Sequence, residues 1–175
     1  MPLFDIAVMI ATAIAVIGGS IAFGFAVSRK SMTALRERMA VLNAAIRGAA
    51  DRLGLPCVEP PPWRHPIVGD VPAGASIRGE HLGRSLRIAV QSDEDAHELV
   101  IVLAPMRGTK WPKLGKLDAS RDADRFPALA SLAALAREIR VTPSELHILL
   151  AQDGAAALLA ALEAALALAT ALDAI

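Results

Sequence analysis

The sequence lacks several features that direct chemistry or export. It has no tyrosine, a single cysteine (Cys57) and no net charge, because 18 Lys and Arg residues balance 18 Asp and Glu residues. One cysteine cannot form an internal disulfide, which is typical of a domain in a reducing compartment. A net charge of zero gives the whole chain no general attraction to nucleic acid or to membranes, so any such attraction depends on local patches.

Motifs of known catalytic or metal-binding type are absent as well. The sequence contains no HExxH, no CxxC pair, no GxSxG and no dinucleotide-binding glycine loop. Residues 69–76 have the glycine spacing of a phosphate loop, but Ala75 stands where the lysine is needed. His81 and His97 lie near an acidic turn, 93–95, and we interpret them as solvated surface residues. We therefore predict no catalytic residue, no metal site and no cofactor.

Charge is also absent from a long segment near the N-terminus. Residues 6–27 contain no charged side chain, and as a helix they would extend about 33 Å, close to the roughly 30 Å of a hydrocarbon core. The residues before them include an aspartate and no cation, unlike a secretory signal. We expect residues 1–28 to form a single transmembrane helix. A buried helix of a soluble protein is the alternative, which the absence of a polar face disfavours.

Four cations follow this segment: Arg29, Lys30, Arg36 and Arg38. Such a bias retains its side of the membrane in the cytoplasm and leaves the short N-terminus outside. We expect these side chains to contact anionic lipid headgroups. Alanine and leucine dominate the chain and 14 arginines accompany only 4 lysines, which is typical of a GC-rich bacterial genome. The predicted location is therefore the bacterial inner membrane, with the C-terminal domain cytoplasmic.

The same helix is predicted to continue through residues 29–54 as an amphipathic, coiled-coil-like segment. Its larger apolar residues have a period of 3.5 and form one seam, made up of Met32, Leu35, Met39, Leu42 and Ile46. In the preceding segment, small residues recur at every fourth position and would let another helix approach closely; these are Ala7, Ala11, Ala15 and Gly19. Both patterns indicate an oligomer interface. The alternatives are a seam that packs on the chain's own domain and a small-residue strip that reflects only composition.

A spacer and a small domain are expected beyond the helix. Gly54 and Pro56 should end the helix, and the proline-rich residues 55–75 predict an extended spacer. Residues 76–175 predict an α+β domain in which an antiparallel sheet packs with two helices. Its expected elements are two strands joined at residues 81–83, an apolar central strand at 99–105, a helix from Phe126 that includes Leu129, Leu132, Leu135 and Ile139, a strand at 145–152 and a helix at 155–174.

The last helix raises a second membrane question, because residues 155–174 are almost entirely Ala and Leu. Its six leucines favour insertion by about 0.3 to 0.6 kcal/mol each, while a central carboxylate such as Glu163 opposes insertion by about 2.5 to 3.5 kcal/mol. The sum is close to zero. Because Glu163, Thr170 and Asp173 can share one polar side, we expect a soluble helix that covers the sheet. A second span is the alternative.

Several segments in this order resemble a family. They are the helix end AADRLGLP, the Pro and Trp spacer, the hairpin RGEHLGRSLRIAV and the strand ELVIVL. In this combination the chain is similar to a loose group of uncharacterised bacterial single-pass membrane-anchored proteins. The resemblance implies an architecture and carries no activity or binding residue.

One basic stretch, residues 106–116, contains no acid. It carries four cations around an aromatic ring: Arg107, Lys110, Trp111, Lys113 and Lys116. Such a set can dock on anionic lipid with the tryptophan at headgroup level, or bind a nucleic-acid backbone with the ring stacked on a base. The third interpretation is a solvated loop whose tryptophan tucks into the domain.

These features predict placement and assembly rather than chemistry. We expect a non-enzymatic membrane-anchored assembly or accessory subunit that contacts membrane lipids, forms a homo-oligomer or joins a larger membrane complex, and presents a protein-binding α+β domain. No nucleic-acid partner is expected. The alternative is a membrane-tethered domain that binds a lipid or a small apolar ligand, or an enzyme whose site has no recognisable motif.

Overall fold

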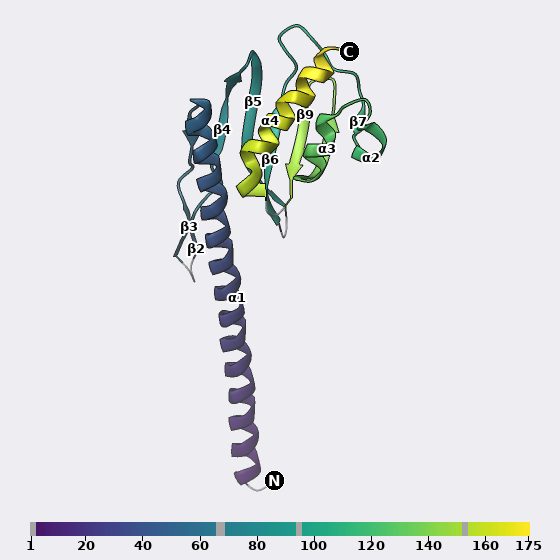
Figure 1. Cartoon of the computed structure of the whole chain (residues 1–175). Coiled ribbons are helices and arrows are strands. Elements are labelled where there is room, and N and C mark those ends of the chain that lie inside the picture. Colours follow the sequence, from purple (N-terminus) through teal and green to yellow (C-terminus); the bar gives the residue numbers. More distant parts are fainter. Residues whose placement is uncertain (1–2, 66–68, 94–95, 152–153) are drawn as a thin grey trace.

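The computed structural model describes the backbone of residues 3–65, 69–93, 96–151 and 154–175 (Figure 1). Side chains are described at Ser20 and in residues 24–64, 69–92, 97–151 and 155–175. The elements in chain order are α1 (Leu3–Leu53), β1 (Cys57–Val58), β2 (Trp63–His65), β3 (Gly69–Val71), β4 (Ser76–His81), β5 (Arg84–Asp93), β6 (Ala96–Leu103), β7 (Gly115–Lys116), α2 (Ala119–Asp122), α3 (Ala128–Ala133), β8 (Ala136–Val141), β9 (Leu146–Leu150) and α4 (Gly154–Asp173).

A single helix of 51 residues, α1, opens the chain. Its C-terminal part packs against the sheet and α4, while its N-terminal part extends well beyond the rest of the molecule (Figure 1). The predicted end at Gly54 is confirmed: the residue has φ +64°, and Leu55 N–H donates to the Ala50 carbonyl. Glycine tolerates this left-handed conformation, which satisfies carbonyls of the last turn and stops the helix.

The sheet has seven antiparallel strands in the order β1-β4-β5-β6-β9-β8-β7, and β2 and β3 form a separate hairpin. The apolar strand β6 is the middle strand, as its uncharged run predicted. Strands β4 and β5 meet in a two-residue turn at Leu82 and Gly83, both of which have positive φ. This turn matches the right-handed twist of the strands it joins. The α+β class with an antiparallel sheet is confirmed.

Helices cover one face of this sheet (Figure 1). Alternate residues of β4, β5, β6 and β9 point into a shared core with α1, α3 and α4. The fully buried side chains at the centre are Ile77, Leu86, Ile88, Ile101, Leu103, Leu146 and Ile148. The opposite face has no helix against it among the described elements, and we call it the open face.

Two sequence-based boundaries are wrong. The spacer expected at residues 55–75 contains three short strands, and one of them, β1, joins the main sheet beside β4. The helix expected through Ile139 ends at Ala133, and residues 136–141 instead form β8. In β8, Ile139 and Val141 pair with Ile148 and Leu146 of β9. Burial of these β-branched side chains against a neighbouring strand outweighs a spacing that also suits a helix.

Helix α4 lies across the sheet, as predicted. Alanines at 161, 165 and 169 are fully buried and bring the helix close to the strands, while Glu163 and Thr170 are exposed. Among the residues searched, which exclude most of the N-terminal apolar segment, Ala155–Asp173 is the one stretch long and apolar enough to cross a membrane. Its buried face is what a core helix of a folded domain shows.

Candidate functional site

The cations that follow the apolar segment do not form one group. Arg29, Lys30 and Arg36 are exposed on α1. Arg38 differs, because its Nε and Nη2 donate to the His97 carbonyl oxygen at 3.0 and 2.7 Å. The predicted lipid contact of Arg38 is therefore wrong. This side chain fastens α1 to the β5–β6 hairpin.

The predicted oligomer seam packs inside its own chain. Met39, Leu42 and Ile46 are buried in the core with the sheet and α4, and Leu35 packs against that core. These residues cannot also form a helix–helix interface with a second copy, so the self-packing alternative holds for them. Met32, half-buried, precedes this contact.

The small-residue strip in α1 falls outside the side chains that the structure describes. Ala7, Ala11, Ala15 and Gly19 lie on the helix, and their predicted interface stays a prediction.

The basic stretch 106–116 lies at the end of the domain opposite the projecting part of α1 (Figure 1). Its four cations are exposed, as a solvated loop requires: Arg107, Lys110, Lys113 and Lys116. Trp111 is only 2% exposed, so its predicted insertion into lipid is wrong. The tryptophan tucks into the domain instead.

Trp111 belongs to a buried polar cluster that the sequence did not reveal. Its indole Nε1–H donates to the Asp173 carboxylate at 2.7 Å, and Arg84 forms an ion pair with the same carboxylate. Burial alone would raise the pKa of Asp173, but the hydrogen bonds from Arg84 and Trp111 outweigh it and hold this pKa below its usual value. Asp173 thus faces inward, not onto the polar side expected for it. The cluster ties the end of α4 to β5 and the basic loop.

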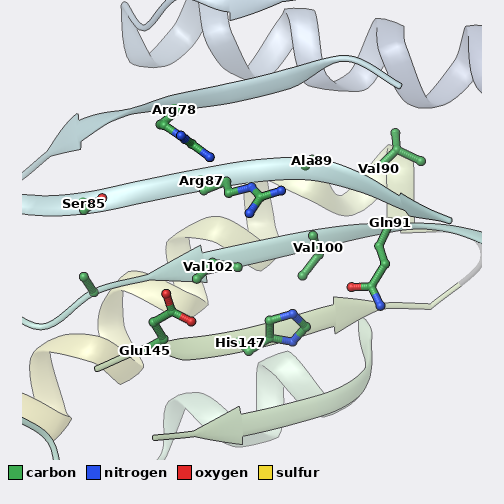
Figure 2. Close-up of a pocket in the computed structure, with 11 residues that line it drawn as sticks. Arg78, Ser85, Arg87, Ala89, Val90, Gln91, Val100, Val102, Glu145 and His147 are labelled. Carbon is green, nitrogen blue, oxygen red and sulfur yellow. The ribbon is translucent and has the colours of Figure 1, made fainter. Parts of the chain in front are cut away.

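The open face of the sheet carries a row of basic side chains. In the strand register, Arg78 of β4 lies opposite Arg87 of β5, Arg87 opposite Val102, Val102 opposite His147 of β9, and His147 opposite Arg140 of β8. We call Arg78, Arg87, His147 and Arg140 the basic row. The row crosses the strands on one face, and Figure 2 shows its members from β4, β5 and β9 above the sheet.

A groove of about 600 Å³ runs over this face and is lined by Arg78, Arg87, His147 and neighbouring residues. Its floor consists of the small or apolar residues Ala89, Val100 and Val102 (Figure 2). Ala89 and Val100 are 6% and 5% exposed although none of the described helices covers this face. Longer side chains around them form the walls of the hollow.

The charges around the groove are unevenly paired. Arg140 pairs with Glu138 at 2.8 Å and Arg137 pairs with Glu98 at 2.9 Å. Arg78 and Arg87 have no hydrogen bond or ion pair with any described side chain. Like charges placed directly opposite on neighbouring strands destabilise a sheet. The two arginines are therefore the best candidates on this face for binding an anionic group.

The sequence indicates part of the basic row. Arg87 alternates with Leu86 and Ile88, and His147 alternates with Leu146 and Ile148, a pattern that places each on the face opposite the core. Their alignment in one row requires the order of the strands, which no local pattern gives.

Comparisons with family models, with curated proteins and with solved structures found no match to this chain. The function is therefore inferred from the geometry.

Proposed function

We propose that this chain is a non-enzymatic, membrane-anchored accessory subunit. In this proposal residues 1–28 span the bacterial inner membrane and the α+β domain presents a protein-binding surface in the cytoplasm. The observation that carries it is the continuity of α1. One helix has an apolar part that projects from the domain and a second part that is packed into it.

The projecting part of α1 has the properties of a segment that needs an apolar environment. Residues 6–27 carry no charge, and within the described side chains of this part Phe25 and Val27 are 56% and 51% exposed. A helix that is apolar on every side is stable when other apolar groups surround it. The described elements of the chain supply none there (Figure 1), and a bilayer would.

The domain is fixed on this helix rather than tethered to it. Asn43 donates from Nδ2 to the Ala73 carbonyl and accepts from Ala75 N–H, both at 2.8 Å. Arg38 holds the β5–β6 hairpin as described, and Ile46 is fully buried. A membrane-spanning α1 would therefore fix the height and the orientation of the domain above the bilayer.

The cations support a cytoplasmic domain. Arg29, Lys30 and Arg36 follow the apolar segment within about 14 Å of helix rise from Val27, and all three are exposed. Cations at this place retain their side of a membrane protein in the cytoplasm and attract anionic headgroups.

The alternative of an apolar ligand between the sheet and its helices has less support. The fully buried alanines of α4 bring it close to the strands, and Leu158, Leu162 and Leu168 fill the contact.

Cysteine accessibility tests the topology. In a Cys57→Ser background, Pro2→Cys places a single thiol before the apolar segment in the sequence, and Ser144→Cys, in a separate variant, places one in the exposed turn between β8 and β9. In intact cells with a permeable outer membrane, an impermeant maleimide should label residue 2 and should reach residue 144 only after lysis. Labelling of residue 144 in intact cells would contradict the proposed orientation.

Size in detergent tests the accessory role. Protein solubilised gently from native membranes should elute as a defined oligomer or together with other subunits, measured by size exclusion with light scattering. A clean monomer without associated protein would contradict assembly.

A further inference from the structure

We propose that the open face of the sheet binds an extended segment of a partner protein in which acidic and apolar residues are mixed. Its carboxylates would pair with Arg78 and Arg87, and its apolar side chains would enter the hollow over Ala89 and Val100. This inference deepens the proposed function, because it names the chemistry of the partner. Of its supports, only the exclusion of membrane lipid as the occupant of this face depends on the proposed anchoring.

Charge complementarity identifies the occupant as anionic. Arg78 and Arg87 are in register on neighbouring strands, and neither forms an ion pair with a side chain that the structure describes. Arg107, Arg137 and Arg140 nearby each have a carboxylate from the chain itself. A guanidinium forms two parallel hydrogen bonds with one carboxylate, so two carboxylates would satisfy both arginines.

The shape of the groove favours a length of chain over a small molecule. Its lining extends along β5 from Ser85 to Gln91, which is about 20 Å of strand. An extended segment of about six residues has the same length.

The composition of the groove indicates a mixed rather than a uniformly acidic segment. Ala89, Val100 and Val102 form an apolar floor, and Glu145 lines the end near Ser85. A carboxylate near Glu145 would be repelled, while one over Arg78 or Arg87 would be attracted. The expected segment therefore places its acids over the arginines and apolar side chains on the floor.

Distance excludes the headgroups of the anchoring membrane as the anion. Along α1, Arg38 is about 17 Å beyond Val27, and it contacts the hairpin at His97. His97 is in register with Ser92, and Arg87 is about 17 Å further along β5. From the β5–β6 hairpin toward Arg87, β5 leads roughly parallel to α1 and away from its projecting part (Figure 1). The basic row is therefore about 30 Å from the hydrocarbon edge. The headgroup layer is only about 5 to 8 Å thick and the screening length is about 8 Å.

Fluorescence anisotropy tests the proposal on the full chain in a non-ionic detergent. The probe is a fluorescein-labelled ten-residue peptide of repeating Glu-Glu-Val-Val, which in an extended chain places both residue types on each face. The reference is the same peptide with Lys in place of Glu. The wild type should bind the Glu peptide, with an affinity that falls as salt rises, and should not bind the Lys peptide. Equal binding of both peptides would overturn the proposal.

Matched variants locate the binding. Arg78→Gln with Arg87→Gln should weaken binding about tenfold or more, while Arg52→Gln with Arg125→Gln, which removes two exposed cations elsewhere, should change it less than about twofold. Ala89→Leu fills the hollow without changing charge and should also weaken binding. The melting temperature of the Arg78/Arg87 variant should be unchanged or higher, since a repulsion is removed. Wild-type affinity in this variant would overturn the proposal.

Two further outcomes separate this proposal from the anchoring. The detergent assay does not depend on whether residues 1–28 span a bilayer. The proposed membrane topology can therefore be contradicted while the peptide still binds, and peptide binding can be absent while the topology is confirmed. In a second arm, the full chain in phosphatidylcholine liposomes is mixed with phosphatidylglycerol vesicles. Capture of these vesicles that is lost in Arg78→Gln with Arg87→Gln would assign the face to lipid and overturn the proposal.

Discussion

The two parts of α1 share one helical geometry and differ in everything that surrounds it. Residues 35–53 place Met39, Leu42 and Ile46 in a core made with the sheet and α4. Residues 3–27 extend beyond the domain without a neighbouring element among those described (Figure 1). In this chain the 3.5-residue apolar seam, a pattern that coiled coils share, packs on the chain's own domain. The uniformly apolar part has no such partner among the described elements, which is the basis of the proposed anchor.

This comparison also changes the role of the helix in the proposed function. A coiled coil below the membrane would have assembled copies of the chain. A helix shared between a membrane and one domain instead sets the position of that domain. In the proposed arrangement, the basic open face of that domain would be presented to proteins rather than to lipid.

The largest effect that sharpens the comparison is expected at Ile46. Ile46→Ala removes a fully buried side chain from the domain part of α1 and should lower the free energy of unfolding by about 2 to 5 kcal/mol. Val41→Ala, on the exposed side of the same turns, should change it by less than about 0.5 kcal/mol. Denaturant unfolding measures both when it is followed by tryptophan fluorescence in a Trp63→Phe background, which leaves Trp111 as the one tryptophan. Equal effects would mean that α1 does not pack on the domain.

A smaller loss is expected at Asn43. Asn43→Ala removes two hydrogen bonds and leaves the buried Ala75 N–H without its acceptor, which should cost about 1 to 3 kcal/mol. Asn43→Asp keeps that acceptor but sets a buried carboxylate against the Ala73 carbonyl oxygen, so its cost should be at least as large. If both variants match the wild type in the same unfolding assay, the link between α1 and the chain before β4 is not as described.

Arg38 should have a smaller effect again. Arg38→Gln removes the paired donation to the His97 carbonyl and should cost about 0.5 to 1.5 kcal/mol, because the site is only partly buried. Arg36→Gln, which is exposed two residues earlier, serves as the control and should be neutral. Hydrogen exchange at the β5–β6 hairpin should increase in the Arg38 variant alone. A neutral Arg38 variant would place the boundary between the two parts of α1 nearer to Met39.

The smallest effect concerns the rate of labelling at Cys57, next to the end of α1. Burial, and then the Glu59 carboxylate, raise the pKa of the Cys57 thiol. The native protein thus holds less thiolate than the unfolded chain at the same pH, and alkylation should be slower in the native state. The native rate should keep rising above pH 9, where an unfolded thiol is already levelling off. Identical pH profiles for the native and the urea-unfolded protein would show that α1 and β1 do not shield this site.

Local patterns in the sequence predicted the elements that local physics determines. Gly54 ended α1, the turn formed at Leu82 and Gly83, and β6 was central because both of its faces are apolar. They failed at β8, where spacing from Leu129 to Ile139 suits a helix and only pairing with β9 selects a strand. They also missed Trp111 and Asp173, which are 62 residues apart in sequence, and the basic row, which requires the strand order.

Carbonate extraction of membranes tests the central claim, that α1 continues from the bilayer into the domain, most directly. The full chain and a variant lacking residues 2–28 are expressed in bacteria, and their membranes are washed at high pH. We predict that the full chain stays in the membrane pellet, while the variant is found in the supernatant as a folded domain that unfolds cooperatively in urea. Release of the full chain by carbonate, or retention of the shortened variant, would contradict the account.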